Sequence, residues 1–373
     1  MPGPRRVAIV HDWLTGMRGG EKVLEEICGL YPDAPIHTLV RASGTVSRTI
    51  ESRRIRTSFV QTLPNASAAY RRYLPLFPMA VELFDFDNYD LVISTSHCAV
   101  KSIIRPGAAV HVCYCHSPMR YAWDQFPAYF SEEQVGVVGN RLLRPIMAGL
   151  ARWDRATAGR VDRFVANSRY VAARIRRYYN RGSTVVYPPV DTTFYRPNPD
   201  PRVEDPGFLV VSALVPYKRL DVAIRACRQI GAPLTIAGRG PEQPRLEALG
   251  GTAVRFLGWV SDDDLRALYS RAAAVLLPGV EDFGMVPVEA QACGCPVVAV
   301  GVGGACETVI DGVTGVLAAD GSVEAFADAL ERCRRTTFDR EAIRASALRF
   351  SRERFRAGFQ AVVTDALTAG AHR

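Results

Sequence analysis

Residues 188–213 run PPVDTTFYRPNPDPRVEDPGFLVVSA, and this stretch divides the chain in two. Six prolines fall within 188–207, and proline can neither continue a helix nor donate to the ladder of a central strand. We therefore predict an extended connection between two domains. The apolar run 208–213 that follows has the length and composition of a buried strand, so regular structure resumes there.

Short apolar runs alternate with helical stretches on both sides of this connection. The predicted strands lie at 7–11, 91–95, 110–115, 163–167, 184–188, 208–213, 234–238, 254–258, 274–278 and 296–300. This alternation is typical of parallel sheets covered by helices on both faces. We expect an α/β architecture of two doubly wound domains facing a central cleft, followed by paired helices over roughly 339–368.

The length of 373 residues suits two domains. The predicted segments are a first domain over 1–188, a linker over 189–206, a second domain over 207–350 and a C-terminal helix over 351–373 that can pack on the first domain.

Composition excludes several classes of protein. A hydrophobic fraction of 48% with 23% charged residues is that of a globular chain, so disorder and a coiled coil are excluded. No apolar run approaches the ~20 residues of a membrane helix, and the first apolar stretch is too short for a signal peptide. Nine cysteines form no disulfide scaffold and are expected as buried thiols. We expect a cytoplasmic protein.

The formal charge of +8 is unevenly distributed. Residues 1–190 carry 25 Lys and Arg against 15 Asp and Glu, whereas residues 191–373 carry 21 against 23. Such asymmetry indicates a polyanion or an anionic membrane surface as partner, and a set of solvated arginines is the alternative. No nucleic-acid-binding motif accompanies the charge, so no nucleic-acid partner is expected.

The loops after the predicted strands carry the candidate site residues, because ligands of doubly wound sheets bind at the carboxyl ends of strands. Gly19 and Gly20 open a helical stretch, where backbone N–H groups can approach an anion. The stretch is neither a dinucleotide fingerprint nor a P-loop, and a tight turn explains it equally well. His116 follows strand 110–115 and can offer a fixed polar atom, although such a histidine is more often structural; the same holds for His11 and His97.

Lys218 and Arg219 stand at the start of the helix after strand 208–213. The helix dipole disfavours cations there, so their position favours an anion such as phosphate between them and the helix. Arg239 and Gly240 open the next helix at the same edge.

Glu281 and Glu289 lie eight residues apart after strand 274–278, the first on a loop and the second about one turn into a helix. Carboxylates accept strong hydrogen bonds from adjacent hydroxyls, so the pair is typical of sugar binding. A solvated loop acid and a dipole-stabilised helix acid are the alternative.

These stretches, in this order, resemble the retaining glycosyltransferases of family 4, whose GT-B fold has two Rossmann-like domains. The family's E-x7-E motif is matched by Glu281 and Glu289, with Phe283 and Gly284 at the expected places. HDWLTGMRGGEKV, YCHSPMRYAWD, YPPVDTTFY, SALVPYKRLD and ETVIDGVTG are further matches. The resemblance spans nearly the whole chain and is strongest to the bacterial branch that builds surface polysaccharides and lipid-linked oligosaccharides, often by mannosyl transfer.

The resemblance implies a role for each matched position. His116 would contact the transferred sugar, Glu281 its hydroxyls, Lys218 the diphosphate and Glu289 the ribose. The predicted catalytic residues are therefore His116, Glu281 and Lys218, and the predicted donor-binding residues are Gly19, Gly20, Arg219, Arg239, Gly240, Gly258, Trp259, Val260, Phe283, Gly284, Met285 and Glu289.

One position departs from the family pattern. Many members carry an arginine where this chain has Ala213, and a second cation stabilises a departing diphosphate. Arg219 or Arg239 is the expected substitute. The resemblance implies no cofactor and no obligatory metal; Asp85 and Asp87 lie away from the sugar-nucleotide loops, and 262–264 is expected to be an acidic helix start.

The implied reaction is hexosyl transfer from a nucleotide sugar, GDP-mannose first and a UDP-hexose second, to a glycan or lipid-linked acceptor at the inner face of the cytoplasmic membrane. Residues 68–79 and five arginines within 141–160 are the expected membrane-facing segments, and a core-facing role for their apolar residues is the alternative. A nucleotide-sugar epimerase of the same fold and a catalytically silent sugar-nucleotide or anion-binding module remain alternatives.

Overall fold

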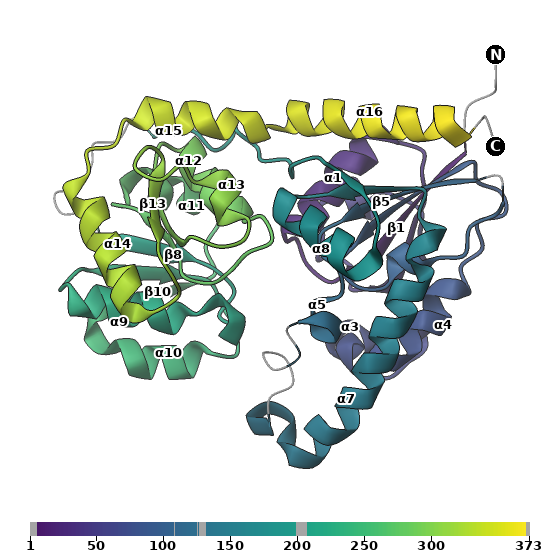
Figure 1. Ribbon diagram of the computed structural model, residues 1–373, viewed down its shortest axis with the longest axis horizontal. Helices are drawn as coiled ribbons and strands as arrows, with labels where there is room; N and C mark the ends of the chain where they lie inside the picture. The colour runs from purple at the N-terminus through teal and green to yellow at the C-terminus, as the bar shows by residue number, and fades with distance from the viewer. Residues whose placement is uncertain (1–5, 108, 125, 127–131, 199–206, 371–373) are drawn as a thin grey trace. The chain divides into compact units, whose positions relative to one another are not determined.

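The computed structural model describes residues 6–107, 109–124, 126, 132–198 and 207–370 (Figure 1). It divides into two compact units: unit 1 comprises Met1–Pro189 with Phe355–Arg373, and unit 2 comprises Val190–Arg354. Residues 199–206 of the predicted linker and 371–373 of the predicted C-terminal helix lie outside the described residues.

Unit 1 contains a seven-stranded sheet in the order β3-β2-β1-β4-β5-β6-β7, and all neighbouring strands are parallel. Its strands are β1 (Val7–Leu14), β2 (Ile36–Arg41), β3 (Ile55–Thr57), β4 (Leu91–Ser96), β5 (Val110–Cys115), β6 (Arg163–Ala166) and β7 (Ser183–Val185). Its α-helices are α1 (Gly19–Leu30), α2 (Arg48–Glu51), α3 (Ala66–Ala69), α4 (Phe77–Glu82), α5 (Arg120–Trp123), α7 (Glu132–Ala156), α8 (Arg169–Tyr179) and α16 (Arg352–Gly370, in unit 1 from Phe355), with 3₁₀ turns η1 (Phe59–Thr62), η2 (Tyr70–Leu76), η3 (Val100–Ser102) and η4 (Thr157–Arg160).

Helices cover both faces of this sheet, which is why β1 is apolar on both sides. Val10 packs in the cluster that holds α4 and the second half of α7, whereas its neighbour Ile9 packs with α1 and α16. Successive side chains of a strand point to opposite faces, so a doubly covered strand needs a continuous apolar run. Phe355 and Phe359 place α16 against the ring of Tyr114 on β5.

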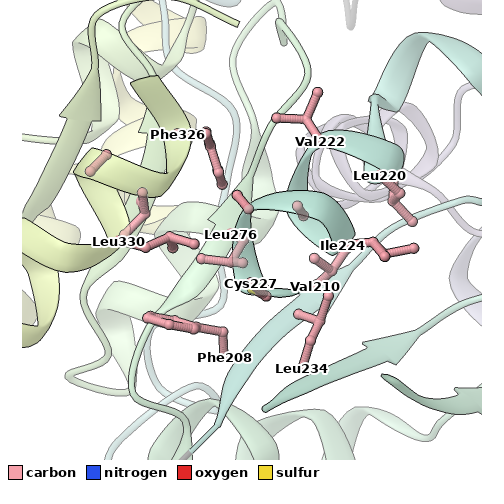
Figure 2. Close-up of a cluster of buried hydrophobic side chains, with 14 of the residues drawn as sticks. Phe208, Val210, Leu220, Val222, Ile224, Cys227, Leu234, Leu276, Phe326 and Leu330 are labelled. Atoms are coloured by element: carbon pink, nitrogen blue, oxygen red, sulfur yellow. The ribbon is translucent and has the colours of Figure 1, made fainter. Parts of the chain in front are cut away.

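Unit 2 contains a six-stranded sheet in the order β10-β9-β8-β11-β12-β13, again parallel throughout. Its strands are β8 (Phe208–Val211), β9 (Leu234–Ala237), β10 (Val254–Gly258), β11 (Val275–Leu277), β12 (Val297–Val300) and β13 (Gly315–Ala318). Its α-helices are α9 (Leu220–Gln229), α10 (Gln243–Gly250), α11 (Asp262–Arg271), α12 (Met285–Ala292), α13 (Ala305–Thr308), α14 (Val323–Arg335) and α15 (Arg340–Ala347), with η5 (Pro216–Lys218), η6 (Gly251–Ala253) and η7 (Leu348–Phe350). Figure 2 shows the core beneath α9 and α14, where Ile224, Leu276 and Phe326 meet.

The two parallel sheets and most of their strands are as predicted, and three strands were missed. β2 was missed because polar His37 and Thr38 interrupt its apolar pattern, although both are buried. β3 has only three residues, and β13 has four directly after a glycine-rich turn. The helices predicted over roughly 339–368 are present as α15 and α16, and the missed β13 and α14 precede them.

Eight of the nine cysteines are buried free thiols, and Cys306 is exposed. Burial raises the pKa of Cys28 and Cys293 to about 12, so these thiols stay protonated near neutral pH. In the part of the chain that the structure describes, no helix is both long and apolar enough to cross a bilayer.

Candidate active site

The predicted site residues gather at the carboxyl ends of the parallel strands, one group in each unit. In unit 1, Gly19 and Gly20 follow β1, and His116 follows β5. In unit 2, the predicted residues follow β8, β9, β10 and β11, and Glu289 lies on α12. Parallel pairing brings these strand ends to one edge of each sheet, where doubly wound folds bind ligands.

Asp12, near the end of β1, holds the loop that carries one of the histidines of the unit 1 group in place. The two carboxylate oxygens of Asp12, which is fully buried, accept hydrogen bonds from the backbone N–H groups of residues 97–100, at 2.7–3.1 Å. This cap fixes the turn after β4 and with it His97, whose ring also meets Trp13 edge-on at 4.3 Å between centroids. A carboxylate that accepts several N–H bonds makes a rigid anchor, because each bond is charge-assisted.

Gly20 lies directly beneath two histidines. A Cβ atom on Gly20 would lie 3.6 Å from Nε2 of His116 and 3.7 Å from Cε1 of His11. Both contacts are ordinary van der Waals distances, so the backbone tolerates a side chain but the space above the glycine is narrow. Nε2 of His116 is buried and has no hydrogen-bond partner among the described residues, whereas Nε2 of His11, also without one, lies 3.7 Å from Oε1 of Glu21. Buried polar atoms without partners are rare, so Nε2 of His116 marks this space as one suited to a polar ligand.

Burial controls the protonation of this group. It lowers the pKa of His116 well below the ordinary value, and the neighbouring rings of His97 and His11 act in the same direction. The pKa of His97 is likewise lowered by burial, although Asp12 opposes the shift. His116 is therefore neutral near pH 7 and can donate or accept a hydrogen bond without carrying charge.

The unit 2 group centres on an ion pair between Lys218 on η5 and Glu281 on the loop after β11. Gly279 permits their approach, because a Cβ atom there would lie 2.7 Å from the carbonyl oxygen of Tyr217 and 2.9 Å from backbone atoms of Lys218. The Glu281 backbone is fixed in turn by a bridge to Gly303. An ammonium and a carboxylate are thus held side by side at the sheet edge, both largely shielded from solvent.

Glu289 occupies the buried side of α12. Gly284, with φ 86°, precedes the helix, Met285 is its first residue, and the Glu289 side chain points into the unit with 4% of its surface exposed. The hydroxyl of Tyr269 donates to its Oε2 at 3.3 Å. Phe283 is buried against the ring of Phe350, with centroids 5.3 Å apart. The carboxylate is held on a rigid element, which is what oriented binding of hydroxyls requires.

The remaining predicted residues line the neighbouring loops. Arg219 has a left-handed backbone (φ 53°) and pairs with Asp221 at 3.4 Å. The Arg239 side chain lies over Gly258, 3.5 Å from the position of a Cβ atom there. Trp259 is 70% exposed. Gly240 and Val260 complete the loops, and a Cβ atom on Gly240 would collide with the backbone of residue 214, so packing alone requires that glycine.

Sequence reasoning missed several residues that shape the site. Asp12, Thr95 and Glu21 hold the histidines of unit 1, and Tyr269 holds Glu289. The available signal for Asp12 was its place in the sequence: His11, Asp12 and Trp13 directly follow the apolar run 7–10. A strand buried on both faces normally stays apolar, so polar residues at its end indicate a special role.

The acidic residues at 262–264 and at 85 and 87 lie where the sequence predicted. Residues 262–264 do form an acidic helix start, capped by the Ser261 hydroxyl, which accepts from the N–H of Asp264 at 3.2 Å. Asp85 accepts from the N–H of Asp87 in a turn before β4, at the opposite end of that strand from His97. No group of three or more His, Cys, Asp or Glu side chains within the described ranges has the arrangement of a metal site.

Two family models match consecutive parts of the chain: "Glycosyltransferase Family 4" over residues 17–194 and "Glycosyl transferases group 1" over residues 191–347. The chain belongs to the family 4 glycosyltransferases.

Relatives and solved structures agree with this membership. D-inositol 3-phosphate glycosyltransferases of Rhodococcus erythropolis and Mycobacterium tuberculosis are 36% and 32% identical over 199 and 202 residues, or 46% and 48% of this chain. The matches span 45% and 42% of those proteins, so less than half of each relative is covered. The Anabaena protein HepE, solved with UDP, superposes with a TM-score of 0.72 at 22% identity over 96% of this chain and 100% of HepE. The lipopolysaccharide outer core galactosyltransferase WaaB superposes at 0.66 and 15% identity, over 96% and 99%. The family 4 chain thus has the GT-B type of fold.

Gly20→Ala tests whether the space above Gly20 serves a ligand rather than the fold. Because the added methyl group makes only ordinary contacts and alanine favours a helix, we expect a melting temperature equal to or above that of the wild type. The methyl group fills the space beside His116, so turnover of nucleotide sugar should fall about tenfold or more. Gly29→Ala on the same helix is the control, since a Cβ atom there meets nothing within 4 Å. Equal turnover in both variants would show that the space is not used.

Proposed function

We propose that this family 4 chain is a retaining glycosyltransferase that moves a hexose from a nucleoside-diphosphate sugar to a growing glycan. The pairing of Lys218 with Glu281 at the carboxyl edge of unit 2 is the observation that carries the proposal. It sets a cation for a diphosphate beside a carboxylate for sugar hydroxyls, and those are the two parts joined by the bond that breaks.

Each group of the pair can exchange its partner for part of the donor. A diphosphate oxygen would take the Lys218 ammonium, and sugar hydroxyls would take the Glu281 carboxylate. Since both side chains are already held in position and largely desolvated, little reorganisation accompanies binding. Arg239 and Arg219 are the candidates for the second cation that Ala213 does not supply. Arg239 is the stronger one, because it lies over Gly258, beside the loop proposed for the nucleobase.

The other unit 2 residues fit the nucleoside. The buried Glu289 carboxylate would accept from the ribose hydroxyls, with Tyr269 holding its Oε2. The backbone of 258–260 and the exposed ring of Trp259 would meet the base. The backbone of Phe283, Gly284 and Met285 would lie beside the sugar and phosphate.

In unit 1 we propose that neutral His116 contacts a hydroxyl of the transferred sugar and that the N-terminus of α1, at Gly19 and Gly20, approaches the diphosphate. A neutral imidazole suits an uncharged hydroxyl, and the pKa of His116, lowered by burial, keeps the ring in that form.

The proposed reaction breaks the bond between the anomeric carbon and the diphosphate oxygen. The bonding electrons leave with the diphosphate, so negative charge develops there, and the Lys218 ammonium stabilises it. The acceptor hydroxyl adds to the same face of the oxocarbenium-like sugar, and a phosphate oxygen of the leaving group takes its proton. Configuration is thereby retained without a protein nucleophile.

GDP-mannose is the donor we favour and a UDP-hexose the second choice, on the resemblance to the mannosyl-transferring branch. UDP accompanies HepE in its solved structure, which keeps the second choice open. A lipid-linked glycan is the proposed acceptor. Because the relatives described above are named D-inositol 3-phosphate glycosyltransferases, inositol 3-phosphate is the soluble acceptor to test beside it.

Titration calorimetry with GDP, UDP and the two nucleosides tests the assignment of unit 2. Lys218→Ala should weaken nucleoside-diphosphate binding by roughly 1.5–3 kcal/mol, or about ten- to 150-fold, and leave nucleoside binding within about twofold. Glu289→Gln should weaken both ligands alike, because both contain the ribose. Glu281→Gln should keep diphosphate affinity but lose turnover.

Arg228→Ala, an exposed substitution on α9, serves as the matched control. Equal losses for nucleoside and nucleoside diphosphate in Lys218→Ala would remove Lys218 from the diphosphate site. Inhibition by UDP without inhibition by GDP would reverse the order of donors.

We further propose that unit 1 binds an anionic membrane surface reversibly from its α7 side. After the kink at Gly136, Arg141, Arg144, Arg152 and Arg155 recur at helical spacing along one exposed stripe of α7. Leu142 and Ile146 are exposed as well, whereas Met147 and Leu150 pack in the core. Each basic residue near an anionic leaflet contributes about 1 kcal/mol, so this stripe suffices for reversible binding.

The other expected membrane segment is only partly available. Tyr70, Leu74 and Phe77 are buried in the core of unit 1, so the expectation that the aromatic and aliphatic residues of 68–79 face a membrane was wrong for them. Arg71, Arg72 and Met79 are exposed. The burial of Tyr70, Leu74 and Phe77 follows from their spacing, because apolar residues that recur every three or four positions share the core-facing side of a helical turn.

Co-sedimentation with anionic vesicles at low salt tests the membrane proposal. Charge reversal of Arg152 and Arg155 to glutamate should weaken binding by at least about 2 kcal/mol, roughly thirtyfold, and leave donor hydrolysis unchanged. Reversal of Arg71 and Arg72 should act in the same direction. Reversal of Arg334 and Arg335, exposed on α14 of unit 2, changes the net charge equally and should have no effect. Wild-type protein that ignores such vesicles would point to a soluble acceptor.

A further inference from the structure

Three polar side chains, those of Glu21, His11 and Thr95, form a buried chain beside Gly20. Nδ1 of His11 lies 2.5 Å from the Thr95 hydroxyl, and Nε2 of the same ring lies 3.7 Å from Oε1 of Glu21. The His11 side chain is fully buried and that of Glu21 is 4% exposed. None of these three residues belongs to the E-x7-E motif or to the predicted donor-binding set, yet His11 forms one wall of the space above Gly20.

Glu21 is held from its other side by the loop. Its Oε2 accepts from the backbone N–H of Arg18 at 3.0 Å, which closes the first turn of α1. Burial acts to raise the pKa of Glu21, but its interactions with His11 and His97 hold that pKa below the ordinary value. The carboxylate is therefore ionised near neutral pH, and an ionised carboxylate offers only acceptors.

The tautomer of His11 follows from these partners. Facing an acceptor, Nε2 of His11 carries the hydrogen, and Nδ1 then accepts from the hydroxyl of Thr95. Nδ1 faces Thr95 and Nε2 faces Glu21, so the ring presents its Cε1 edge to the space above Gly20. His116 alone of the two rings offers a hydrogen-bonding nitrogen to that space.

We propose that Glu21 is a positioning residue: through His11 it keeps the space above Gly20 free of a second hydrogen-bonding ring nitrogen, so that the ligand pairs with His116. The inference deepens the proposed function and rests on it, because the ligand meant is the sugar or phosphate of the donor. The same carboxylate also orders the start of α1, because it accepts from the backbone N–H of Arg18. The Glu21 side chain therefore fixes both the His11 ring and the helix start that border the space above Gly20.

Glu21→Gln separates positioning from folding. The glutamine keeps the size of the side chain and an oxygen for the Arg18 N–H, but it presents an NH₂ donor to His11. His11 should then accept at Nε2 and carry its hydrogen at Nδ1, so the tautomer reverses. The ¹⁵N shifts of the labelled imidazole in the full chain report this reversal directly. We expect kcat for donor hydrolysis to fall about tenfold or more with KM within about twofold.

Glu26→Gln is the matched control. Glu26 lies on the same helix, is equally buried and pairs with Arg356 at 2.6 Å, so its loss affects stability without touching the histidines. An unchanged His11 tautomer in Glu21→Gln, or a reversed tautomer with the kcat of Glu26→Gln, would overturn the inference. Wild-type protein without turnover would refute the proposed function instead, and the tautomer would still show whether Glu21 fixes His11.

Discussion

Parallel pairing of strands that are buried on both faces is the constraint on which the rest of this molecule depends. Each sheet is parallel throughout, so every strand of a unit ends at the same edge. Helices cover both faces, and the strand interiors must then be apolar. With exceptions such as His37 and Thr38 in β2, polar side chains therefore concentrate at the strand ends and in the turns that leave them. The candidate site residues of both units lie at these strand ends, in the turns that leave them or on the helices that follow.

At these edges, backbone groups fix the residues around the candidate site. Asp12 gathers four N–H groups after β4, and Glu281 is fixed by the bridge to Gly303. A charged group that is fully hydrogen-bonded and shielded from water keeps its geometry, whereas an exposed one loses it to side-chain entropy. The ion pair of Lys218 with Glu281 and the chain from Glu21 to Thr95 follow the same principle. Preorganisation of this kind is what stabilises charge developing in a transition state.

The sequence predicted the architecture well because its signal is local. A buried parallel strand needs a continuous apolar run, and a proline-rich stretch interrupts regular structure, so both are visible without tertiary information. β2 escaped because His37 is buried among aromatic rings, an environment that only the folded chain creates. The roles proposed for Lys218, Glu281 and His116 rest on motif resemblance, and spacing alone left each residue with a structural alternative. Glu21 and Thr95 could not be predicted, since their contacts join residues up to 84 positions apart.

The central claim is that this family 4 chain transfers a hexose out of a nucleoside-diphosphate sugar. Phosphorus NMR of the full chain incubated separately with GDP-mannose and UDP-glucose tests it most directly, because many transferases slowly hydrolyse their donor without acceptor. The account predicts that one donor is converted to free nucleoside diphosphate and hexose. Both donors remaining intact, or a nucleotide sugar epimerised with its diphosphate bond unbroken, would contradict it.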